Sequence, residues 1–129
     1  MHPDLQLIKE ASDGLLYVSE SDYPFEAVEF GEFTSIEEKI IEITGQDPKV
    51  PVEKVTLEYF LRHMTRVDAE GPENQRQTAQ RFIHLQQLLL QKLKDVVVYR
   101  LGTVQVDVFI MGRSTDNHYI GLRTKSIET

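Results

Sequence analysis

Two apolar stretches joined by a glycine turn near the C-terminal end constrain the fold most. Residues 96–101 are mostly apolar, Gly102-Thr103 interrupts them, and residues 104–111 begin with a regular alternation of apolar and polar side chains. This pattern predicts a β-hairpin. A turn over 114–117 precedes another expected strand over 119–124. Strands joined by such short turns pair antiparallel, so the last third of the chain predicts an antiparallel sheet.

The first two thirds of the chain carry mostly helical periodicity. Apolar side chains recur at helical spacing in the stretches 5–11, 36–43, 57–64 and 79–93. Gly14 and Gly45 follow the first two stretches, where a glycine is suited to end a helix. Helices early and in the middle, with antiparallel strands at the end, predict an α+β layered fold.

Capping residues and short apolar runs divide this region further. The helix over 36–43 has a capping box in one of two registers, Thr34 with Glu37 or Ser35 with Glu38, and Thr56 is a candidate cap for the next helix. The remaining apolar runs predict a strand over 15–18 buried on both sides, a strand over 25–30, and an edge strand over 50–55 that contains Pro51.

Length and composition indicate one domain covering residues 1–129, because a chain of this size can bury a core of its own. The absence of cysteine excludes a disulfide framework and a thiolate zinc site. No apolar stretch is long enough for a membrane span, and the first residues lack the pattern of a signal peptide. We therefore expect a cytoplasmic protein that makes no membrane contact.

The net charge is -7, and the acidic side chains are concentrated in the first third. Between Glu10 and Glu42 ten acids face one base, Lys39; the others are Asp13, Glu20, Asp22, Glu26, Glu29, Glu32, Glu37 and Glu38. Such a charge disfavours direct binding to nucleic acid or anionic lipid and favours a basic partner. Two interpretations remain open: a solvated acidic face, or a decoy surface for a protein that grips phosphates.

No pattern of catalytic residues stands out. The sequence lacks a glycine-rich phosphate loop and a nucleophile elbow, and its histidines, His2, His63, His84 and His118, are far apart. The acids around Gly71 do not have the spacing of a calcium-binding EF-hand loop. We predict neither an enzyme nor a cofactor. A pocket that grouped His63, His84 and carboxylates would reverse that prediction.

Several short motifs occur in an order and spacing that resemble the nuclease A inhibitor family, small acidic proteins that block a sugar-non-specific, magnesium-dependent endonuclease. The matching residues are Ala11-Ser12-Asp13-Gly14-Leu15-Leu16, Ser19-Glu20-Ser21, Tyr23-Pro24-Phe25-Glu26, Val98-Tyr99-Arg100-Leu101-Gly102, Asp107-Val108, Thr124-Lys125 and Glu128-Thr129. The resemblance covers nearly the whole chain.

The resemblance implies a three-layer α-β-α sandwich like that of pathogenesis-related protein 1, with a mainly antiparallel sheet and no catalysis. It also implies that Thr129, at the C-terminus, ligates the Mg²⁺ of the partner nuclease, and that Glu20 makes a polar contact at the active site of the nuclease. Glu128 either adds to the acidic field or is a solvated tail residue. These roles require Glu20 to lie beside Thr129.

One departure from the family concerns the loop before the longest predicted helix. The family has a tryptophan there that contacts the partner, whereas this chain has no tryptophan. Alignment back from the Val98–Gly102 motif places Glu70 at that position and Asp68 at the position of a nearby glutamine. Loss of an aromatic anchor weakens an interface hot spot. The alternative is therefore a binding module on the same fold for a different basic or metal-bearing protein.

Overall fold

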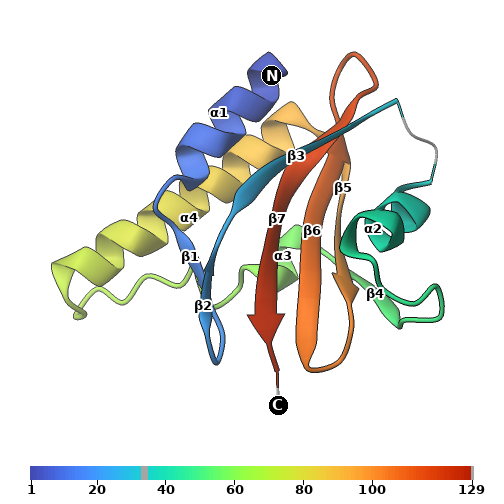
Figure 1. Ribbon diagram of the computed structural model, residues 1–129. Helices are drawn as coiled ribbons and strands as arrows, with labels where there is room; N and C mark the ends of the chain where they lie inside the picture. The colour runs from blue at the N-terminus through green and yellow to red at the C-terminus, as the bar shows by residue number, and fades with distance from the viewer. Residues whose placement is uncertain (33–34, 129) are drawn as a thin grey trace.

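The computed structural model describes residues 1–32 and 35–128, and Figure 1 shows their arrangement. Within these residues the main sheet has the strand order β3-β7-β6-β5-β4, and β1 pairs with β2 in a separate hairpin. The strands are β1 (Leu16–Val18), β2 (Asp22–Pro24), β3 (Glu26–Gly31), β4 (Val52–Val55), β5 (Lys94–Leu101), β6 (Gln105–Arg113) and β7 (Tyr119–Ile127). Every pairing among them is antiparallel, so the prediction of an α+β fold with a mainly antiparallel sheet is confirmed.

The helices are α1 (Pro3–Ser12), α2 (Ile36–Thr44), α3 (Leu57–Phe60) and α4 (Glu73–Lys92). Figure 1 shows α1 and α4 together on one side of the sheet and α2 on the other. Gly45 ends α2 in a left-handed conformation, and the Thr56 hydroxyl caps α3 by accepting from the Tyr59 N–H at 3.1 Å. Both ends agree with the sequence prediction.

The alternation of side chains along the central strands divides the described core in two. Successive residues of a strand point to opposite faces. Val98, Val108 and Ile110 therefore pack with α1, α3 and α4, while Phe109 and Met111 pack with α2 on the other face. All of these side chains are buried. Because both faces of the sheet are covered, β6 becomes continuously apolar toward its end.

The predicted hairpin over 96–111 is confirmed as β5 and β6, which pair from Leu101 with Asp107 onward. Gly102 has a φ of +107°, and a Cβ atom there would lie 2.6 Å from the carbonyl oxygen of Gln105. The turn therefore requires glycine. The last strand is longer than predicted, because β7 continues to Ile127 alongside β6.

The prediction that residues 15–18 form a strand buried on both sides is wrong. Leu15 is buried, but Leu16 and Val18 are 43% and 53% exposed. A short apolar run does not reveal how many faces of its strand are covered, and this one lies in the hairpin with β2, outside the main sheet.

Two predicted helix features also differ. The helix α3 ends at Phe60 and does not extend to residue 64. Ser35 precedes α2 without a side-chain capping bond to the described residues, so the Ser35 register of the capping box does not form. The register that uses Thr34 lies outside the described residues. In the part of the chain that the structure describes, no helix has the length and apolar character to cross a membrane.

Candidate functional site

The candidate site is a hollow of about 410 Å³ beside the end of β7, where the chain leaves the sheet. Figure 1 shows the β1–β2 hairpin descending next to this end of the sheet. The hollow is lined by Tyr17, Ser19, Glu20, Val55, Tyr59, Phe60, Arg62, Arg100, Ser126, Ile127 and Glu128. We call the surface formed by these residues the tail face.

The turn between β1 and β2 is bonded to the end of β7. The Ser19 hydroxyl donates to the Ser21 carbonyl at 2.8 Å and accepts from the Ile127 N–H at 3.0 Å. The Glu20 N–H donates to the Ile127 carbonyl at 3.4 Å. A hydroxyl that donates and accepts at once needs a fixed position, so Ser19 sets the distance between the turn and the tail.

Arg100 of β5, which also lines the hollow, holds the tail through a second set of bonds. Its guanidinium donates through Nη1 to Glu53 at 2.9 Å and through Nη2 to Glu128. The Ser126 hydroxyl donates to the same Glu128 oxygen at 2.9 Å, and the Glu128 N–H donates to the Val104 carbonyl at 2.8 Å. The Glu128 side chain and backbone are thus both engaged within the chain.

These contacts shift the ionisation of both partners toward the charged pair. Burial works against the charge of Arg100, but the hydrogen bond and charge of Glu128, aided by Glu53, raise the pKa of Arg100 above its ordinary value. Burial also opposes the charge of Glu128, yet the hydrogen bonds from Arg100 and Ser126 lower the pKa of Glu128. The pair is therefore ionised at neutral pH.

Aromatic side chains form the wall of the hollow nearest α3. The rings of Tyr17 and Phe60 stack with centroids 4.4 Å apart, and burial raises the pKa of the Tyr17 hydroxyl. Tyr59 is 52% exposed, and the Arg62 guanidinium lies 3.8 Å from its ring centroid. The tail face thus combines an exposed aromatic ring and a cation with the acidic corner.

Comparison with protein families matches residues 3–129 to the model of the nuclease A inhibitor-like protein family. The chain belongs to this family. Its members are protein inhibitors rather than catalysts, and membership supports a role as a nuclease inhibitor with a nuclease as partner. A comparison with curated proteins finds no match.

The structure brings together two of the residues that the family resemblance singled out. Glu20 and Glu128 both line the hollow, and the main chain at Glu20 contacts the residue before Glu128. Thr129 lies outside the described residues. Asp68 and Glu70 are exposed in the loop between α3 and α4, where the Glu70 N–H donates to the Asp68 carboxylate at 3.0 Å, and neither lines the hollow.

A second hollow, of about 300 Å³, connects β1 with that loop. Leu16 and Val18 of β1 line it together with Met64, Arg66 and the first turns of α4. Because Tyr17 points to the tail face and its two neighbours point to this hollow, β1 lies between the two depressions. Asp68 and Glu70 line neither hollow; Met64 and Arg66, earlier in the same loop, are the residues that reach the second one.

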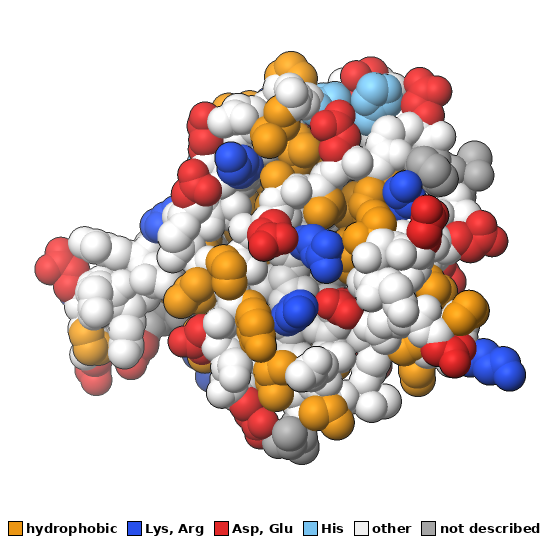
Figure 2. All heavy atoms as spheres, viewed as in Figure 1, with side chains coloured by type: hydrophobic (Ala, Val, Ile, Leu, Met, Phe, Trp, Pro, Cys, Tyr) orange, Lys and Arg blue, Asp and Glu red, His pale blue; other side chains and the backbone are white. Residues whose placement is uncertain are grey.

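The histidines that would have indicated an enzyme are not grouped. His63 lines the second hollow and His84 does not. The acids of the first third are spread over α1, the β1–β2 hairpin, β3 and α2. Figure 2 shows acidic and basic side chains intermixed over β3 and β7, so the acidic segment does not form one continuous face in this view.

Sequence reasoning missed the role of Arg100. The residue was part of a matching motif, but its two acidic partners come from β4 and from the C-terminal tail. One signal was present: a single base in the apolar stretch 96–101. A charged side chain in such a stretch indicates that it is paired with an opposite charge. Which acid forms the pair could not be predicted, because that depends on the order of the strands in the sheet.

Proposed function

We propose that this protein inhibits a metal-dependent, non-specific DNA and RNA endonuclease by placing its C-terminal tail in the active site of the nuclease. The observation that carries the proposal is the bonding of the Ser19–Ser21 turn to Ile127, which joins the acidic corner to the tail. Family membership supports the inhibitor role. The proposal adds the tail as the inhibiting element.

In this mechanism Thr129 supplies oxygen ligands to the Mg²⁺ of the nuclease. Mg²⁺ is a hard cation that prefers oxygen, and a C-terminal threonine has a hydroxyl and a carboxylate on one residue. Glu20 contacts basic groups around the metal, while Asp68 and Glu70 contact the partner from the neighbouring loop. The negative charge of the chain steers the encounter and makes it sensitive to salt.

Glu128 has a supporting role in this proposal. Its carboxylate accepts from Arg100 and Ser126 within the chain. A carboxylate that is already paired gains little from a new cation, because a second partner replaces bonds that exist. Glu128 therefore acts by holding the tail in place for Thr129, and it contributes to the acidic field as a secondary effect.

Appending one glycine after Thr129 tests the role of the tail. The extension removes the terminal carboxylate from its position while leaving the sheet and the Ser19–Ile127 bond intact. We expect inhibition of a cognate nuclease to fall by about a hundredfold or more, since a metal ligand and its fit are lost. Equal inhibition by the extended and natural chains would show that Thr129 does not ligate the metal.

The missing tryptophan favours a second candidate, a binding module for another basic or metal-bearing protein. Glu70 is exposed where the family has its aromatic contact. Under this alternative, affinity purification returns a partner that is not a nuclease, and the protein leaves nuclease activity unchanged. The main proposal also includes a single domain over residues 1–129 with the three-layer sandwich of the family. It places the protein in the cytoplasm and assigns it no cofactor.

A further inference from the structure

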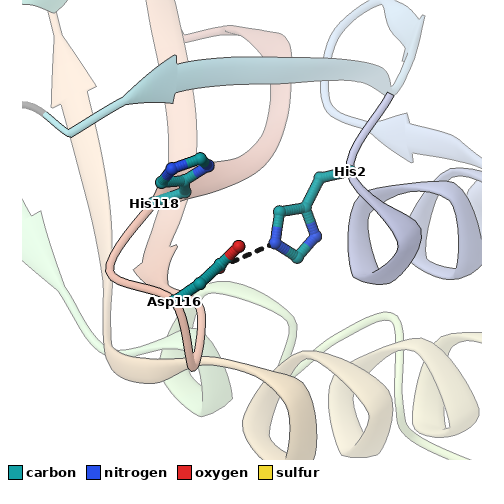
Figure 3. Close-up of side chains that lie close together, drawn as sticks. All are labelled: His2, Asp116 and His118. Carbon is teal, nitrogen blue, oxygen red and sulfur yellow. Dashed lines mark hydrogen bonds and ion pairs between the residues drawn. The ribbon is translucent and has the colours of Figure 1, made fainter.

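We propose that His2, Asp116 and His118 form a binding site for a divalent transition-metal ion of the zinc class. Figure 3 shows the three side chains gathered between the start of α1 and the turn that joins β6 to β7. One potential ligand atom from each residue lies within 4.8 Å of the others. Two imidazoles and one carboxylate are ligands that Zn²⁺ takes, whereas Mg²⁺ favours oxygen alone.

The β6–β7 turn holds two of the ligands in a fixed relation. The Ser114 N–H donates to the His118 carbonyl at 2.9 Å, and the His118 N–H donates to the Ser114 hydroxyl at 3.0 Å. That hydroxyl also donates to Asp116. Asn117 has a left-handed φ of +62°, which closes the turn. A ligand pair on such a bonded turn needs little reorganisation to bind a metal.

His2 is the least exposed ligand, with a side chain 9% exposed. Its Nδ1 atom accepts from the Asp4 N–H at 3.1 Å. A backbone N–H can only donate, so in the neutral ring the proton lies on Nε2, which donates to Asp116 at 2.8 Å. The bond with Asp116 therefore directs Nε2 toward the position of the proposed metal.

Metal binding at Nε2 requires the other tautomer of His2. The proton leaves Nε2, a proton from solvent joins Nδ1, and the neutral ring binds the metal through the Nε2 lone pair. Because the Asp4 N–H is fixed in the first turn of α1 and two donors cannot face each other, the His2 ring must also shift away from it, and water then accepts from that N–H. This exchange gives the bound state a signature that a nonspecific ion on the surface does not produce.

The charge around the site also favours a cation. The Glu32 carboxylate lies 3.8 Å from His118 Nε2, and its side chain is 76% exposed. It adds a negative charge next to His118, and its carboxylate is available as a fourth ligand if the side chain rotates toward the metal. With or without Glu32, the site has the composition of a zinc site with three protein ligands and one exchangeable position.

A metal here joins residues that are 114 positions apart in the case of His2 and Asp116. It ties the start of α1 to the β6–β7 turn, at the opposite end of the sheet from Ile127, where β7 ends (Figure 1). A ligand that binds the folded chain stabilises it by mass action. We therefore expect zinc to raise the melting temperature without changing nuclease inhibition, so the inference does not depend on the proposed function.

The test titrates ZnCl₂ into the full chain, freed of any affinity tag and of residual metal, and follows heat of binding and melting temperature. We expect one Zn²⁺ per chain and a rise in melting temperature that MgCl₂ does not reproduce. His118→Gln should abolish the rise, and Asp116→Asn, which keeps an acceptor for His2, should weaken zinc binding by about tenfold or more. The exposed histidines outside the cluster provide matched controls, so His63→Gln and His84→Gln should bind as the natural chain does.

Nuclear magnetic resonance of the His2 ring nitrogens supplies the second measurement. The proton should lie on Nε2 without metal and on Nδ1 at zinc saturation. Any of three results overturns the site. The first is a natural chain whose stability does not respond to zinc, and the second is a His118→Gln variant that binds zinc as well as the natural chain. The third is retention of the Nε2 proton at zinc saturation, because His2 is then not a ligand.

Discussion

The N–H of Glu20 donates a hydrogen bond to the carbonyl oxygen of Ile127, 3.4 Å away, and so joins the β1–β2 turn to the end of β7. The Ser19 hydroxyl reinforces this contact by accepting from the Ile127 N–H. The corner and the tail are therefore held together before any partner binds. Association costs less when the contacting segments are already ordered, which favours presentation of both segments to one surface.

Ser19→Ala is expected to loosen the tail. The substitution removes the acceptor of the Ile127 N–H and should lower the free energy of unfolding by about 1 kcal/mol. Nuclease inhibition should weaken as well. Ser21→Ala is the matched control. Among the described residues no hydrogen bond is found for the Ser21 hydroxyl, and the bonds that Ser21 makes to Ser19 use its backbone carbonyl, which the substitution keeps. Urea denaturation and inhibition constants for both variants measure the effect; equal losses would count against the role of Ser19.

Arg100 binds one carboxylate in the tail and one in β4, so the effects of the two contacts on inhibition can be measured separately. Glu128→Gln removes the ion pair to the tail, and Glu53→Gln removes the ion pair to β4. Both carboxylates are substantially exposed, so each change should lower the free energy of unfolding by less than about 1 kcal/mol. Inhibition should weaken in Glu128→Gln alone.

The control for general charge loss is Asp95→Asn, which removes the ion pair with Arg113 away from the tail face. Its inhibition constant should match that of the natural chain. If Glu53→Gln weakens inhibition as much as Glu128→Gln does, Arg100 acts through the stability of the sheet and not through the tail.

The ionisation of Glu128 predicts a pH dependence of stability. Its pKa in the folded chain lies below the ordinary value of 4.5, because the hydrogen bonds from Arg100 and Ser126 outweigh the opposing effect of burial. A lowered folded pKa stabilises the fold above the unfolded pKa, and this stabilisation is lost as pH falls through the folded value. The stability difference between the natural chain and Glu128→Gln should therefore be constant near neutral pH and shrink below about pH 4.5. Urea titrations over that range test it, and a difference that persists in acid contradicts it.

Gly121 of β7 should tolerate no side chain. A Cβ atom there would overlap the carbonyl oxygen of Ile110 in the neighbouring strand, and the backbone of a central sheet cannot move away. We expect Gly121→Ala to lower the free energy of unfolding by about 3 kcal/mol or more. Gly31→Ala is the comparison, because it has open space but a φ of +69°, and its expected loss is about 1–2 kcal/mol. Thermal or urea denaturation ranks the two, and the reverse order would contradict the packing argument.

Periodicity located most elements because it reports which faces of an element are covered. The spacing of apolar residues and the positions of glycine and proline in the sequence predict several elements correctly. These are the hairpin of β5 and β6, the edge strand β4, the end of α2 at Gly45 and the end of α4 near residue 93. The β1–β2 hairpin did not, since its short apolar run has the composition of a buried strand while Leu16 and Val18 remain exposed.

The candidate site, too, was only partly predictable from the sequence. The sequence by itself determined the acidic corner at Glu20 and, through the order of its motifs, the family. Only the tertiary structure decided that Ser19 bonds to Ile127, 108 positions later, that Arg100 lies between Glu53 and Glu128, and that His2 meets Asp116. Spacing along the chain fixes which side chains share a face of one element. Contacts between distant elements depend instead on strand order and register. These put β7 beside β6 and the end of β7 beside the β1–β2 turn.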